Sequence, residues 1–141
     1  MKNSKGQWLM LVLCAVLAAT MACGDDPTGN GNALVGTWNV TSLTFPGEPG
    51  LGDPVVDDGL VFRITFNANG TYAMAVSNDD PSDPWICEGT TSCTEGGDYS
   101  VSGSSITFDE GTSDEATGTF SISGDTLTMT GGDVRFVAQR V

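Results

Sequence analysis

Residues 59–77, GLVFRITFNANGTYAMAVS, are the clearest indication of the fold that this chain adopts. In both halves of the stretch large apolar residues occupy every second position, and the turn Asn-Ala-Asn-Gly, residues 67–70, separates the halves. Alternation with a period of two predicts strands that are buried on one face. A turn rich in Asn and Gly accepts the positive φ angles of a tight hairpin. The stretch therefore predicts two antiparallel strands.

The same pattern continues on both sides of this hairpin. Short alternating segments are separated by tight turns rich in Gly, Asn, Asp and Ser, and no segment has the periodicity of a helix. The predicted strands are residues 34–43, 59–67, 70–77, 97–102, 104–109, 116–123, 125–130 and 133–141. Successive hairpins predict an all-β fold, an antiparallel up-and-down meander barrel of about eight strands, with a two-sheet sandwich as the alternative.

The alternation assigns one face of each strand to the barrel interior. On the second predicted strand Leu60, Phe62 and Ile64 share one side, and a slip of one residue would bury Arg63. Val134 is assigned to the interior in the same way. In a small barrel, positions that fill the core and positions that line a ligand cavity are the same, and the candidates for both roles are Phe62, Ile64, Phe66, Tyr72, Met74, Tyr99, Phe108, Phe120, Met129 and Phe136.

Residues 1–22 have the order of a secretory signal peptide. Lys2 and Lys5 precede an apolar run, residues 8–19, and small residues follow it. The run is shorter than the ~20 residues that a membrane-spanning helix needs. We therefore expect residues 1–22 to be removed.

The residues before Cys23 indicate which kind of signal-peptide cleavage is expected. Residues 19–22, Ala-Thr-Met-Ala, resemble the lipobox of bacterial lipoproteins. The resemblance implies cleavage before Cys23 and a lipid anchor, such as a diacylglycerol with palmitate chains, on its sulfur. It also implies a place in the bacterial cell envelope, and Gly24 after the cysteine favours the outer membrane, at its periplasmic face or at the cell surface. Residues 23–33 then form a flexible tether.

Two cysteines remain in the stretch CEGTTSC, Cys87 and Cys93. In the oxidising compartment that the lipobox resemblance implies, a disulfide between them is expected, and closing so short a loop stabilises the fold by roughly 2 kcal/mol. The spacing is not C-x-x-C, and the chain has no His. A redox or zinc site is therefore not expected.

The charge of the chain limits its partners. The net charge is −13, and without Lys2 and Lys5 three arginines face eighteen acidic residues. Such a surface repels phosphate backbones, which excludes nucleic-acid binding. The carboxylates of acidic loops such as residues 77–84 are candidate ligands for a calcium ion, but loops of this composition are usually solvated turns. We expect no catalytic residues, no metal site and no cofactor.

Gly36 and Trp38, with one residue between them on the first predicted strand, resemble the Gly-x-Trp signature of the lipocalin family. Short bacterial lipocalin-like lipoproteins also contain sequence segments similar to GDYSVSGSSITF, residues 97–108. The resemblance covers residues 34–141 and implies that Arg140, near the end of the last strand, packs across Trp38. Gly36, Trp38 and Arg140 would then plug one end of the barrel.

Two functions are consistent with the sequence. The first is binding or carriage of a small apolar ligand in the barrel of a membrane-anchored lipoprotein. The second is a non-catalytic role in the envelope, as a protein-interaction or structural accessory that has a filled barrel and works through loops such as residues 46–58 and 78–96; the sequence identifies no protein partner. An interior void of several hundred Å3 that opens to solvent would favour the first.

Overall fold

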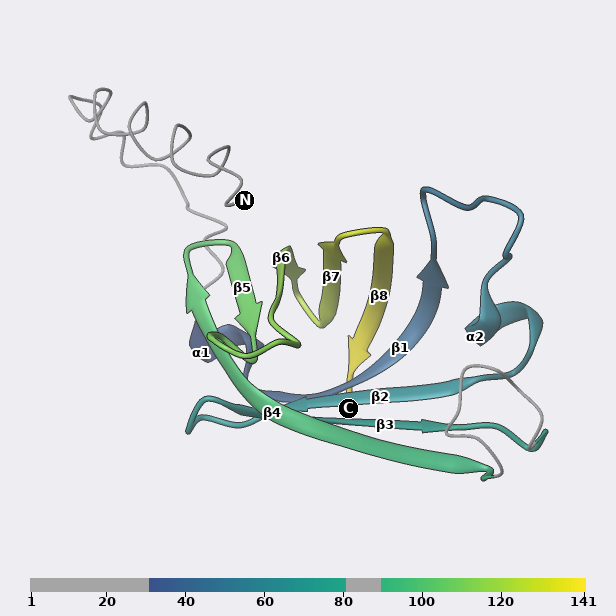
Figure 1. The fold of residues 1–141 in the computed structure, drawn as a ribbon, viewed down its shortest axis with the longest axis horizontal. Helices are drawn as coiled ribbons and strands as arrows, with labels where there is room; N and C mark the ends of the chain where they lie inside the picture. Colours follow the sequence, from purple (N-terminus) through teal and green to yellow (C-terminus); the bar gives the residue numbers. More distant parts are fainter. Residues whose placement is uncertain (1–30, 81–89) are drawn as a thin grey trace, which may run out of the picture.

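The computed structural model describes residues 31–80 and 90–141, which form a closed barrel of antiparallel strands (Figure 1). Each strand pairs with the next along the chain, and the last strand pairs with the first. The strands are β1 (Gly36–Thr44), β2 (Val61–Phe66), β3 (Thr71–Ser77), β4 (Ser92–Ser102), β5 (Ser105–Phe108), β6 (Ala116–Ser123), β7 (Thr126–Gly131) and β8 (Val134–Arg140). The predicted eight-stranded meander is confirmed, and the sandwich is excluded.

Two single-turn helices differ from the sequence prediction of no helix. They are α1 (Gly31–Leu34), which leads into β1, and α2 (Pro54–Asp57), which lies between β1 and β2. One turn is too short to show a helical period in the sequence, although Asp53 before Pro54 is a typical helix start. Within the described ranges, no helix has the length and apolar character needed to cross a bilayer.

Strand β4 begins at Ser92, five residues before the start predicted from the sequence. Its first half pairs with β3 alone, because pairing with β5 begins only at Tyr99. This half is mostly exposed and contains Gly96 and Gly97, so it has no alternating apolar residues that could have marked it as a strand.

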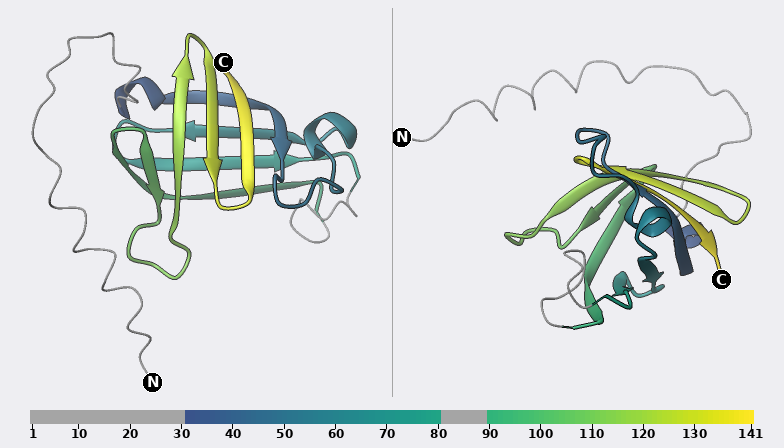
Figure 2. Two further views of the ribbon diagram at one scale, coloured as in Figure 1. Left: turned by 90° about the horizontal axis from the view of Figure 1, so that it is seen from above. Right: turned by 90° about the vertical axis from the view of Figure 1, so that its right-hand side faces the viewer.

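Strand β1 pairs with a different strand on each side (Figure 2). Gly36–Asn39 pairs with β2 and Trp38–Thr44 pairs with β8, with a shift in the β8 register between Val40 and Ser42. Asp53 holds the part that has left β2. Its carboxylate accepts hydrogen bonds from the Ser42 hydroxyl, at 2.7 Å, and from the Leu43 amide, at 3.0 Å. The same carboxylate caps α2.

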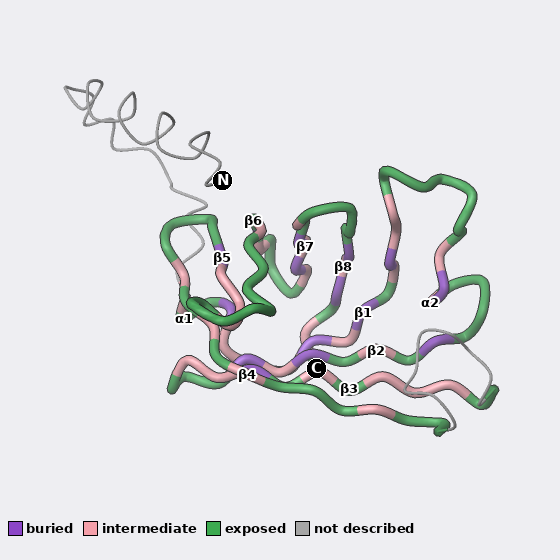
Figure 3. The backbone as a smooth tube through the Cα atoms, in the orientation of Figure 1, coloured by how far each residue is buried: buried purple, intermediate pink, exposed green. Residues whose placement is uncertain are grey.

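Buried core residues occur along the whole barrel. We call one end of it the closed end: β1 begins there, β8 ends there, and Trp38 lies inside it. Buried residues occupy the inward positions of the strands (Figure 3). Val134 shares the predicted inward face of β8 with Phe136, but it is 37% exposed. It lies opposite Gly131, which has no side chain to cover it.

Candidate functional site

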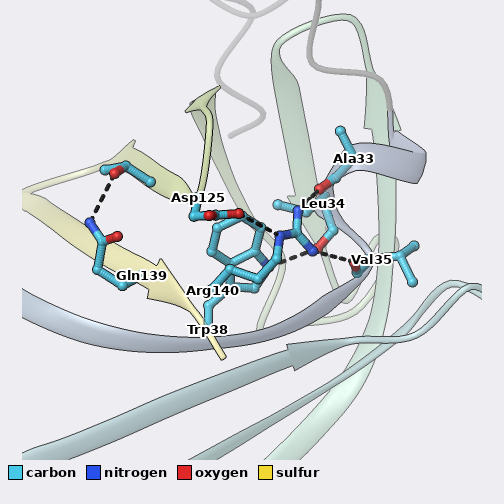
Figure 4. A network of polar contacts seen from close by, with 8 residues as sticks. Ala33, Leu34, Val35, Trp38, Asp125, Gln139 and Arg140 are labelled. Atoms are coloured by element: carbon cyan, nitrogen blue, oxygen red, sulfur yellow. Dashed lines mark hydrogen bonds and ion pairs between the residues drawn. The ribbon is translucent and has the colours of Figure 1, made fainter.

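Trp38 and Arg140 meet at the closed end (Figure 4). Trp38 is fully buried, and its indole Nε1 donates a hydrogen bond of 2.8 Å to the Leu34 carbonyl. The guanidinium carbon of Arg140 lies 4.1 Å from the centre of the Trp38 ring. A cation–π contact of this kind contributes about 0.5–2 kcal/mol. The first and last strands are thereby joined through their side chains as well as through their backbones.

Arg140 also holds the chain that leads into β1. Its two terminal nitrogens donate to the carbonyls of Val35, at 2.9 Å, and Ala33, at 2.6 Å. Together with the Trp38 bond, three successive carbonyls at the end of α1 receive a donor. Gly36 has a φ of +136°, and a Cβ atom there would lie 2.7 Å from Arg140 Nη1. Only glycine leaves room for the arginine, so the structure brings Gly36, Trp38 and Arg140 together.

The opposite end of the barrel is hollow. A pocket of about 450 Å3 lies between β5, β6, β7 and β8. Its residues come mostly from the inward positions of these strands, and they are Phe108, Ala116, Thr117, Gly118, Met129, Gly131, Gly132, Val134 and Phe136. None of these side chains is charged. The pocket is therefore suited to a ligand that is itself largely apolar.

Three of the ten candidate lining residues, Phe108, Met129 and Phe136, line this pocket. The other seven fill the barrel instead. Four of them are buried in the core, namely Ile64, Phe66, Tyr72 and Phe120, and three are packed against it, namely Phe62, Met74 and Tyr99. Their rings meet one another, as in the edge-to-face pair of Phe66 and Tyr99 at 5.1 Å. These seven side chains are thus packed into the core, and the space that remains lies beside Phe108, Met129 and Phe136.

The sequence analysis missed the glycines of the pocket. Gly118 and Gly131 occupy inward positions, two residues before Phe120 and two after Met129, where other strands carry large side chains. A Cβ atom on Gly118 would lie 2.7 Å from the Thr130 carbonyl oxygen, so strands β6 and β7 approach each other closely here. Glycine at an inward position of an alternating strand was the available signal.

Tyr72 and Asp109 link the core to the edge of the pocket. The Tyr72 hydroxyl donates a hydrogen bond of 2.7 Å to Asp109 Oδ2, and the other carboxylate oxygen accepts the Asp98 amide at 3.1 Å. The Tyr72 ring packs edge-on against Phe108 with 4.9 Å between centroids. Burial raises the pKa of Tyr72 to about 12, and the hydrogen bond to Asp109 and nearby carboxylates add to the effect.

The raised pKa of Tyr72 predicts a specific alkaline titration. The chain has two tyrosines, and burial also raises the pKa of Tyr99. Because the unfolded chain releases the Tyr72 proton near pH 10 and the barrel only near 12, stability is lost as the pH rises through this window. Absorbance at 295 nm should show one tyrosine ionising near pH 12, and Tyr72→Phe should remove that step. A Tyr72 step near pH 10 in the folded protein would contradict the buried hydrogen bond.

The cysteines and the acidic residues that the structure describes do not form a further site. Cys93 lies on β4 opposite Val76, whereas Cys87 and Cys23 fall outside the described residues, so the disulfide and the lipid anchor stay predictions. Within residues 31–80 and 90–141, no group of three or more Cys, Asp or Glu side chains is arranged to hold a metal ion.

Comparison with known proteins assigns the family. The family model described as "Lipocalin-like domain" matches residues 34–129, which include Trp38 and most of the pocket. Strand β8, with Arg140, lies beyond the matched residues. The comparison with curated proteins found no match to the chain. Because the match spans more than half of the sequence and agrees with the eight-stranded barrel, the chain belongs to the lipocalin-like domain family.

Proposed function

We propose that this protein binds or carries a small apolar molecule in the pocket opposite the closed end, without catalysing a reaction on it. The observation that carries the proposal is the pocket itself, with a volume of about 450 Å3 and no charged side chain in its lining. Ligand sites in proteins have volumes of roughly 300–1,000 Å3 and are lined mainly by apolar and aromatic side chains.

The lining offers adaptable apolar contacts. Phe108 and Phe136 present aromatic surface, and Met129 adjusts its shape to irregular ligands because its side chain is unbranched and flexible. Burial of apolar ligand surface is favourable by roughly 25 cal/mol per Å2, so affinity depends on how completely the ligand fills the pocket. The packed core prevents the ligand from going deeper.

A single substitution in the lining tests the proposal. Ala116 is exposed and lines the pocket, so Ala116→Phe should fill the space without disturbing the core. We expect titration with a fluorescent apolar probe to show at least about tenfold weaker binding to this variant, a loss of ~1.4 kcal/mol or more. Ala75→Phe is the matched control, because Ala75 is also exposed but lies outside the pocket on β3.

The result also separates the two functions considered from the sequence. Equal probe affinity of the Ala116→Phe variant and the parent protein would contradict pocket binding and favour an accessory role with a filled barrel. Native mass spectrometry of the protein purified from its own host should reveal a bound molecule of lipid size. Its release on denaturation would identify the ligand.

We also propose that Cys23 carries a lipid anchor that holds the barrel at the bacterial outer membrane. The support is the resemblance of residues 19–22 to a lipobox and the apolar run before them. Cys23→Ala should move the protein from the membrane fraction to the soluble fraction while the circular dichroism of the barrel stays unchanged. Retention of the variant in washed membranes would count against the anchor.

A further inference from the structure

Two acidic turns adjoin the pocket in sequence, residues 109–115 and 131–134, and we refer to them together as the mouth. Residues 109–115 connect β5 to β6, and the residues on either side of this loop, Phe108 and Ala116, line the pocket. The loop has the sequence DEGTSDE, with four carboxylates in seven residues. Three of residues 131–134 also line the pocket, and the fourth is Asp133. Carboxylates thus border an uncharged pocket from two sides.

The cations of the described residues lie elsewhere. Arg63 is exposed on the outer face of β2, where its Nε donates to Asn39 Oδ1 at 2.9 Å. Arg135 is exposed on the face of β8 opposite to Val134 and Phe136. Arg140 covers Trp38 at the closed end. Residues 31–80 and 90–141 contain no Lys or His, so no other described side chain can offer a positive charge to a ligand in the pocket.

Thr117 is the lining residue with a hydroxyl group, and the Tyr72 hydroxyl beside the lining residue Phe108 is already hydrogen-bonded. Tyr72 packs against the lining residue Phe108, but its proton is donated to Asp109 at 2.7 Å. The hydroxyl is therefore not available as a donor to an anionic group of a ligand. A carboxylate entering the pocket would meet several carboxylates and no matching donor from this tyrosine.

We infer that the ligand is a cationic amphiphile, whose apolar chain occupies the pocket and whose amine or quaternary ammonium group stays at the acidic mouth. This inference rests on the proposed function. The apolar lining supplies the affinity for the chain, and the carboxylates at the mouth select the charge of the end group. An anionic amphiphile with the same chain is disfavoured by the same charges.

Three amphiphiles with one chain length test the selection. Dodecyltrimethylammonium and dodecanoate, each below its micelle concentration, and dodecanol, below its solubility limit, compete with a bound fluorescent apolar probe at low and at moderate ionic strength. We expect the cation to bind at least about tenfold more tightly than dodecanoate at low salt, with dodecanol between them. The difference should shrink when salt screens the charges.

Two turn aspartates provide a matched pair of variants. Asp133→Asn removes a charge at the mouth, whereas Asp125→Asn removes one at the closed end, where the Asp125 carboxylate is 82% exposed and 3.9 Å from Arg140. Both variants change the net charge equally. Asp133→Asn should weaken binding of the cation about two- to threefold, as expected for one charge at short range in water, and Asp125→Asn should leave it unchanged. Ala116→Phe should abolish binding of the cation if it occupies the pocket rather than the acidic surface.

The outcomes distinguish this inference from the proposed function. Equal affinity for the three amphiphiles, or tighter binding of dodecanoate, would overturn the cationic ligand and leave the apolar pocket intact. Cation binding that survives Ala116→Phe would overturn it as well, because the cation would then be held by the surface. Failure of the probe to bind the parent protein would overturn both proposals.

Discussion

Replacing Trp38 by alanine should lower the free energy of unfolding by about 3–5 kcal/mol. The indole is fully buried at the closed end, so its removal leaves a cavity between β1, β2 and β8. The substitution also removes the donor to the Leu34 carbonyl and the ring beneath Arg140. Because domains of this size are stable by roughly 5–15 kcal/mol, the loss would be a large share of the total.

Trp38→Phe separates the packing of the ring from its hydrogen bond. Phenylalanine keeps an aromatic face for Arg140 but has no N–H for Leu34, so a loss of about 1–3 kcal/mol is expected. Unfolding in urea, followed by far-ultraviolet circular dichroism, measures both variants against the parent protein. A loss below 1 kcal/mol for Trp38→Ala would show that the closed end is not packed around this residue.

Asp53→Ala should be the second most damaging change described, with a loss of about 2–3 kcal/mol. The carboxylate accepts four hydrogen bonds, from the Ser42 hydroxyl and from the backbone amides of Leu43, Val55 and Val56. Loss of the helix cap costs about 1 kcal/mol, and loss of the charge-assisted bonds to β1 adds to it. Urea unfolding measures the total. A neutral result would mean that solvent replaces these bonds without cost.

Asp53 also predicts how the free energy of unfolding changes with pH. Burial alone would raise the pKa of Asp53, but the hydrogen bonds from Leu43, Ser42 and the α2 amides outweigh it and lower the pKa below the usual 3.8. The stabilisation is therefore complete above pH 3.8 and is lost as the pH falls through the lower value of the folded state. Asp53→Asn should make the free energy of unfolding less sensitive to pH in this range.

The strands could be predicted because their signal is local. Within β2, from Phe62 to Phe66, and within β3, from Tyr72 to Val76, each inward residue is separated from the next by one outward residue, and this period of two is visible without any tertiary information. The first half of β4 could not be predicted, since it is exposed and pairs on one side only. The single-turn α2 was also missed, because its stability comes from Asp53 rather than from periodicity.

The two ends of the barrel differ in how much the sequence revealed. The Trp38–Arg140 pair was expected from the lipocalin resemblance, but its hydrogen bonds to the carbonyls of Ala33 and Val35 were not, because backbone acceptors carry no sequence signature. Alternation identified Phe108 and Phe66 as inward-facing without distinguishing pocket from core. That distinction depends on Gly118 and Gly131, which place no side chain at two inward positions of β6 and β7.

The position of α1 gives the barrel a direction with respect to whatever precedes it in the chain. Gly31 lies beside Val101 near the end of β4, so the polypeptide enters the barrel at the plugged end, and the pocket mouth is at the other. A tether from a lipid on Cys23 would therefore join the barrel on the side away from the pocket. It would not cross the pocket opening, so a ligand would enter or leave without displacing the anchor.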